Sequence, residues 1–102
     1  MSESRRSVAA VPNAAIVRGR IRRIAADPAG GTVWELAVET ARDVPGMPNF
    51  AQAHVGQDLS VYVHPELSHD LAEGDRVQAR VTFRGDERGG RFALAADDVR
   101  KV

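Results

Sequence analysis

The chain has 102 residues, which suits one domain able to bury roughly two-thirds of its unfolded surface. It contains no cysteine, so disulfides, thiolate nucleophiles and zinc-thiolate sites are excluded. Its 14 basic and 14 acidic residues give a formal net charge of zero, which argues against strong, indiscriminate binding of nucleic acid.

Residues 1–13 have no periodicity and are rich in small and polar side chains. We therefore expect a disordered tail before a single domain spanning 14–102. Arg5 and Arg6 are not followed by an apolar run, which argues against a secretory signal. The chain has no stretch of roughly 20 apolar residues, the length that a membrane-spanning helix needs. Together with the lack of cysteine, this predicts a cytoplasmic protein that does not enter the membrane.

Residues 14–24 show the two-residue alternation of a half-buried strand. The face predicted to point inward carries Ala15, Val17, Gly19 and Ile21, and the outer face carries Arg18, Arg20 and Arg22. Ile24 would fall on the arginine face, so we expect a β-bulge near Arg23 that returns Ile24 to the core. A glycine inside a strand often marks such a bend. Asp-Pro-Ala-Gly-Gly at 27–31 then predicts a turn.

A second strand is predicted over 32–44, and it ends before Pro45 because proline cannot donate to a ladder. Its apolar face holds Trp34, Leu36, Val38 and Thr40. Glu35 and Glu39 lie on the outer face, where antiparallel pairing with the first strand would set them opposite arginines. Arginines held by glutamates in this way are less available to phosphate.

The irregular loop 45–57 follows, and Phe50 within it is expected either to pack back on the core or to serve as an exposed contact residue. Residues 58–64 predict a third strand, with Leu59, Val61 and Val63 inward and Tyr62 and His64 outward. Residues 65–71 can form a short helix or a single turn, with Pro65 suited to the first position.

Residues 71–102 predict a β-hairpin. After a Glu-Gly-Asp turn at 73–75, strict alternation points Val77, Ala79, Val81 and Phe83 inward and Arg76, Gln78, Arg80, Thr82 and Arg84 outward. The polar, glycine-rich turn 85–90 contains Arg88 and leads to a last strand with Phe92 and Leu94 on its apolar side.

This order of elements, five strands with a short helix between the third and fourth, is that of the all-β OB-fold, a five-stranded Greek-key barrel. Val17-Arg18-Gly19-Arg20-Ile21 is similar to the opening Val-x-Gly-x-Ile of nucleic-acid-binding OB domains of the tRNA-anticodon-binding type. Leu71 to Val77 resembles their entry into the fourth strand, and Phe92 to Val99 resembles their closing strand. The resemblance implies an OB-like barrel whose first strand lies beside its fourth, and a role in binding single-stranded nucleic acid.

For that role the candidate stacking platform is Tyr62 with His64, because single-strand binders combine stacking rings with a basic groove. The candidate cations lie on the first strand and the last hairpin: Arg18, Arg20, Arg22, Arg76, Arg80, Arg84, Arg88 and Arg91. The charges are also segregated, since residues 1–23 hold six arginines against one acid and residues 24–75 hold nine acids against one arginine. Such a local field can steer a partner when the net charge cannot. The simpler interpretation is that these are ordinary outward residues whose arginine stems cover strand surface.

Motifs for catalysis and for metal binding are not found. Ser60 and Ser68 lie in no nucleophile elbow, and no phosphate-cradling glycine loop precedes a helix. The three histidines, His54, His64 and His69, lack the spacing of a metal site. We therefore expect no enzymatic activity, no catalytic residue, no bound metal and no cofactor.

The sequence thus predicts a non-enzymatic binding module for single-stranded DNA or RNA. The alternative is a protein-interaction or oligomerisation module, since OB barrels also pair through their sheet edges. Neutral net charge favours this alternative. So does the scarcity of aromatics, because Tyr62 is the one aromatic at the outer positions of the second and third strands, where Glu35 and Glu39 add negative charge.

Overall fold

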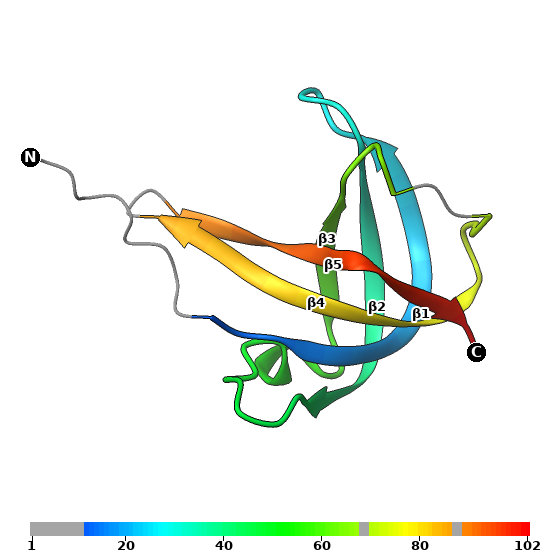
Figure 1. Ribbon diagram of the computed structural model, residues 1–102. Coiled ribbons are helices and arrows are strands. Elements are labelled where there is room, and N and C mark those ends of the chain that lie inside the picture. Colours follow the sequence, from blue (N-terminus) through cyan, green and yellow to red (C-terminus); the bar gives the residue numbers. More distant parts are fainter. Residues whose placement is uncertain (1–11, 68–69, 87–88) are drawn as a thin grey trace, which may run out of the picture.

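The computed structural model of the chain describes residues 12–67, 70–86 and 89–102. Within them five strands close into one barrel (Figure 1), in the order β1-β2-β3-β5-β4 with β4 returning to β1. The strands are β1 (Ala15–Ala26), β2 (Thr32–Asp43), β3 (Asp58–Val63), β4 (Arg76–Asp86) and β5 (Gly89–Lys101). Neighbouring strands are antiparallel, except that β3 and β5 run parallel. The predicted all-β, five-stranded Greek-key OB-like barrel is therefore confirmed.

The core is built from the inward side chains of all five strands, because successive residues of a strand point to opposite sides. The largest side chains with almost no exposure are Ile21, Leu36, Val17, Val61, Val77 and Val81. Trp34 is only 4% exposed and lies in the same cluster, as predicted for a core residue. Since each such side chain contributes roughly 1.5–3 kcal/mol when buried, this cluster is the main force that holds the barrel closed.

The β-bulge expected near Arg23 is present. The register of β1 against β2 shifts between Ile21 and Arg23, which sets Ile24 opposite Trp34. Ile24 then packs against the core instead of joining the arginine face. The extra residue of the bulge thus lets Ile21 and Ile24 both face the core, although strict alternation would point them to opposite faces.

A second bulge, which was not predicted, lies in β2 at Glu39. Arg18 pairs with Thr40, but the next β1 residue, Gly19, pairs two positions further back, so Glu39 has no partner in the register. The extra residue shifts the alternation of β2. Thr40, predicted to face inward, is therefore exposed, and Ala41 is buried in its place.

Gly19 allows the close approach of the two strands at this second bulge. A Cβ atom at Gly19 would collide with the backbone carbonyl oxygen of Ala37 on β2. The predicted bend at this glycine is therefore real, and its cause is the contact between the two backbones.

The short helix predicted over 65–71 is not found in the described part of that connection. Residues 65 and 66 form a turn, in which Nδ1 of His64 accepts a hydrogen bond from the N–H of Glu66 (3.1 Å). Residues 68 and 69 lie outside the described residues. Helical geometry occurs instead in the loop between β2 and β3, as a single 3-10 turn at Gln52–His54. No helix in the described residues is long and apolar enough to cross a membrane.

A side chain extends the β1–β4 ladder beyond the start of β1. Asn13 is buried, donates to the carbonyl oxygen of Phe83 (2.9 Å) and accepts from the N–H of Phe83 (2.7 Å). Because Ala15 pairs with Val81, Asn13 occupies the next paired position and uses its amide group where a strand would use its backbone. Of the tail expected at residues 1–13, residues 1–11 lie outside the described residues.

Candidate nucleic-acid interface

The outward side chains of β4 form a row that its neighbouring strands share. We call this the β4 row, and it consists of Arg76, Gln78, Arg80, Thr82 and Arg84. On one side, the register of β1 sets Arg20 opposite Arg76 and Arg18 opposite Gln78. Since adjacent strands lie about 4.8 Å apart, the arginines of β1 and β4 share one surface. The first strand thus lies beside the fourth, as the resemblance implied.

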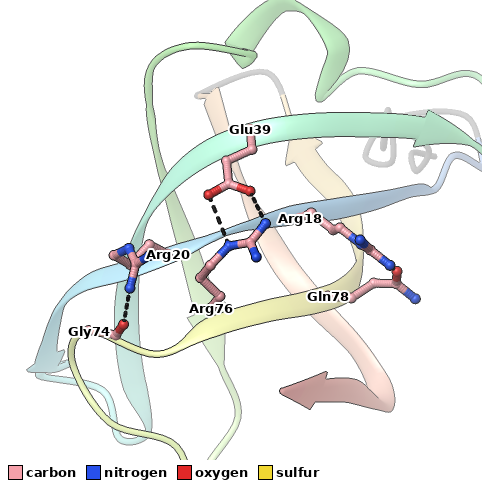
Figure 2. A network of polar contacts seen from close by, with 6 residues as sticks. All are labelled: Arg18, Arg20, Glu39, Gly74, Arg76 and Gln78. Carbon is pink, nitrogen blue, oxygen red and sulfur yellow. Dashed lines mark hydrogen bonds and ion pairs between the residues drawn. The ribbon is translucent and has the colours of Figure 1, made fainter. Parts of the chain in front are cut away.

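Glu39, at the bulge of β2, forms an ion pair with an arginine of this surface. Figure 2 shows Arg76 extending across β1, between Arg18 and Arg20, to meet Glu39 of β2. The ion pair has two contacts: Nη2 of Arg76 lies 2.6 Å from Oε1 of Glu39, and Nε lies 3.3 Å from Oε2. Glu39 was expected to oppose the arginines of the first strand, but its bonded partner is on the fourth.

The two flanking arginines of β1 form hydrogen bonds to uncharged polar groups. Nη1 of Arg20 donates to the carbonyl oxygen of Gly74 (2.6 Å), and Nε of Arg18 donates to Oε1 of Gln78 (3.0 Å; Figure 2). These bonds restrict the guanidinium groups, so less entropy is lost when an anion binds them.

The charges around Glu39 shift its proton affinity. Hydrogen bonding from Arg76, with the fields of Arg76, Arg20 and Arg18, holds the pKa of Glu39 below its ordinary value, although desolvation opposes the change. The same hydrogen bond raises the pKa of Arg76. Both groups are therefore charged at neutral pH, and positive charge predominates on this face.

At the other end of the β4 row, two like charges face each other. Arg84 of β4 is the direct cross-strand neighbour of Arg91 of β5, where the paired ends of these strands project beyond the rest of the barrel (Figure 1). Arg84 has no ion pair within the described part of the chain. Like charges directly opposite destabilise a strand pair, so an anion bound between them would relieve the repulsion.

Arg91, expected only as a cation, lies against the expected stacking platform of Tyr62 with His64. Its guanidinium carbon lies 3.9 Å from the ring centre of Tyr62, and its Nη1 lies 3.4 Å from Oδ2 of Asp27. The ring of His64 meets that of Tyr62 edge-on, with 6.4 Å between centres. Because Arg91 covers one face of the Tyr62 ring, a planar group on this side could stack only on the guanidinium of Arg91 and not directly on the tyrosine.

A hollow of about 490 Å³ opens between these groups, lined by Tyr62, Arg84, Gly85, Gly89, Gly90, Arg91 and Ala93. A second hollow of about 430 Å³ runs past Arg80, Thr82 and Phe83 and shares Arg84 and Gly85 with the first. The outer half of the β4 row therefore borders two neighbouring hollows, both of which Arg84 and Gly85 help to line.

Some predicted site residues lie apart from this surface. Nη1 of Arg22 lies 3.3 Å from Oδ1 of Asp58, at the bulge of β1 and away from the β4 row. Arg88 lies outside the described residues. Within the described residues no three His, Cys, Asp or Glu side chains gather as a metal site.

The sequence analysis did not identify two cations of this surface or an aromatic group. Arg42 of β2 lies opposite Ile16 of β1, and Arg100 of β5 lies opposite Gln78 of β4, so both extend the basic surface sideways. The alternation of apolar and polar residues around these arginines is visible in the sequence, but the bulges decide which face of the sheet each arginine occupies.

A hollow of about 330 Å³ at one end of the barrel is lined by Phe50, His54, Phe83 and Phe92. Phe50 is 41% exposed and packs edge-on against Phe83, so it combines the two roles weighed for it.

Taken together, the surface offers guanidinium groups for anions and one guanidinium–aromatic stack for a planar group. Comparison of the chain with protein-family models, with curated proteins and with solved structures found no match. What the surface can bind therefore follows from its own residues and their arrangement.

Proposed function

We propose that this protein binds single-stranded nucleic acid along the β4 row. The observation that carries the proposal is the register of β1 against β4, which gathers Arg18, Arg20, Arg76 and Arg80 on one outward face. The nearby carboxylate, Glu39, is already bonded to Arg76. The face thus keeps an excess of positive charge in a protein whose net charge is zero.

The β4 row also leads from phosphate-binding groups to a stacking group. Phosphates would contact Arg80 and Arg84, and an unpaired base would stack on Arg91 above Tyr62. Stacking of this kind requires bases that are free of a duplex, which favours a single strand, and it accepts any base. The resemblance of 17–21 and 71–77 to OB domains of the tRNA-anticodon-binding type supports the same class of ligand.

The proposed path lies beside the face of strands two and three, which OB barrels commonly use for oligonucleotides. In this chain that face carries Glu35 of β2 and Asp58 of β3, whose strands pair directly. Carboxylates there repel phosphate, whereas the β4 row attracts it. DNA and RNA are equally compatible with contacts to phosphates and base faces.

A salt-dependent titration tests this function. Fluorescence anisotropy of a labelled single strand of about 15 nucleotides is followed at low and moderate salt, with the wild type, Arg80→Ala and Arg84→Ala. Each substitution is expected to weaken binding and to reduce the slope of log affinity against log salt by about 0.7, the value for one phosphate contact of a single strand.

Arg22→Ala is the matched control, because it removes the same charge from an arginine held by Asp58. It should leave the slope nearly unchanged. No binding by the wild type at low salt, or equal losses in Arg22→Ala and Arg80→Ala, would overturn the proposal.

The second candidate is a protein-interaction module, which the aromatic hollow at Phe50, His54, Phe83 and Phe92 favours. Its rings would accept an apolar or aromatic side chain of a protein partner. If the wild type binds no oligonucleotide but elutes from a sizing column as a larger species, and Phe50→Ser elutes as a monomer, this is the function. Oligonucleotide binding that Phe50→Ser leaves intact would exclude the hollow from the nucleic-acid surface.

A further inference from the structure

The C-terminal part of β5 is an open sheet edge. Val99, Arg100 and Lys101 pair with β4 on one side. The parallel pairing of β5 with β3 is confined to Phe92 and Ala93, so the other side of 99–101 has no strand partner among residues 12–67, 70–86 and 89–102. An unpaired edge is a template for another strand.

The hydrogen-bonding groups of this edge can be assigned from one bond. The N–H of Val102 donates to the carbonyl oxygen of Arg76 (3.0 Å), so residue 102 turns its backbone groups toward β4. In an antiparallel ladder this direction alternates along the strand. Arg100 therefore also bonds toward β4, while the N–H and C=O groups of Val99 and Lys101 point away from the barrel.

We infer that a second copy of this chain pairs with this edge, antiparallel, about a twofold axis at Val99. In this register Val99 of one copy faces Val99 of the other, and the two exchange a pair of backbone hydrogen bonds. Asp98 of each copy lies opposite Arg100 of the other. Both side chains are exposed and share the outer face, so two opposite-charge pairs flank the axis.

The charges select this register over its neighbours. A shift of two residues in one direction keeps the ladder but places Arg100 opposite Arg100, and a shift in the other direction places Asp98 opposite Asp98. A shift of one residue would set Val99, whose backbone groups point toward the second copy, opposite Arg100, whose backbone groups bond to β4. No backbone hydrogen bond could then form between the two. The order Asp98, Val99, Arg100 is thus complementary to an antiparallel copy of itself.

The association is expected to be weak. The β4–β5 register shifts between Ala79 and Val81, so β5 bends before Val99 and only a few residues remain for pairing. Small interfaces of this kind belong to the transient class, and the dimer should become visible at protein concentrations on the order of 100 μM. Pairing at the edge would join two β4–β5 sheets and set their arginine faces side by side.

Charge exchange tests the register by sedimentation velocity over a concentration series, without nucleic acid. Asp98→Arg and Arg100→Asp should each sediment as monomers at concentrations where the wild type dimerises. The double variant Asp98→Arg/Arg100→Asp should dimerise again, and an equimolar mixture of the two single variants should form a heterodimer. A monomeric wild type, single variants that dimerise like the wild type, or a double variant that stays monomeric would overturn the inference.

A backbone variant tests the edge itself. Val99→Pro removes an N–H that faces away from β4, so the ladder within the barrel is retained while the bond to the second copy is lost. It should be folded and monomeric, and a folded Val99→Pro variant that still dimerises would contradict pairing at this edge. Because oligonucleotide is absent from these measurements, their outcome does not bear on the proposed nucleic-acid function.

Discussion

Glu39 of β2 and Arg76 of β4 form a two-contact ion pair across β1, a strand that lies between theirs (Figure 2). The pair ties three strands together at one point of the outer surface. It also partly neutralises the arginine face that β1 and β4 share, so it should affect the proposed ligand binding.

Removing this carboxylate should strengthen the binding of single-stranded nucleic acid. Glu39→Gln leaves Arg18, Arg20 and Arg76 without a neutralising charge, so affinity at low salt should rise on the order of fivefold, with a steeper salt dependence. Anisotropy titration measures both quantities. Glu35→Gln is the control, because it removes the same charge from a residue of β2 that lies opposite Arg23. Equal gains in the two variants would contradict a specific role for Glu39.

The same carboxylate should contribute to the pH dependence of stability. Arg76 holds the pKa of Glu39 below its ordinary value, so the contribution is complete above the unfolded-state pKa and is lost as the pH falls through the folded-state pKa. The free energy of unfolding of wild type minus that of Glu39→Gln should therefore be constant near neutral pH and shrink in acid. Urea titrations from about pH 7 to about pH 3 measure it. A difference that grows on acidification would show that another group is responsible.

Tyr62 should act through its ring and not through its hydroxyl group. The hydroxyl group donates to the carbonyl oxygen of Gly30 (3.0 Å), while the ring supports Arg91. Tyr62→Phe keeps the ring, so oligonucleotide binding should stay within about twofold of wild type. Tyr62→Ala removes the support for Arg91, and binding should weaken by about 1–3 kcal/mol. Equal losses in both variants, measured by anisotropy, would place the effect at the hydroxyl group.

Gly19 should tolerate no side chain. Gly19→Ala brings a Cβ atom against the carbonyl of Ala37, and since the obstacle is backbone, relief requires a strand to move. We expect a loss of at least about 2 kcal/mol in the free energy of unfolding, measured by urea titration. Gly46→Ala is the comparison, because Gly46 has a positive φ of 79° but open space around it. It should lose only about 1 kcal/mol, and equal losses would show that crowding at Gly19 is unimportant.

The strands were predictable because their alternation is regular and their ends carry turn residues. The bulge that returns Ile24 to the core was also predictable, since an isoleucine on an arginine face is costly to leave exposed. The bulge at Glu39 was not, because Thr40 and Ala41 are small enough to fit either face and alternation alone assigned the wrong one.

The candidate surface could be predicted only in part, and the missing part is register. Counting residues shows that Arg76 and Glu39 each face outward, but their meeting depends on which residues of β1, β2 and β4 align. The same is true of the contact between Arg91 and Tyr62, which needs the parallel pairing of β3 with β5. Residues 65–71 were expected to form a short helix or a single turn, and the sequence did not decide between the two; residues 65 and 66 form a turn, in which the side chain of His64 accepts the N–H of Glu66.

The barrel is closed by its shortest described ladder, in which β3 and β5 pair only through Val61 with Phe92 and Tyr62 with Ala93. Such a seam is where native-state breathing begins, so the amide of Tyr62 should exchange with deuterium before those of the β1–β2 ladder. Each opening would carry the Tyr62 ring away from Arg91. Opening of the barrel between β3 and β5 and loss of the contact between Tyr62 and Arg91 would therefore be one motion.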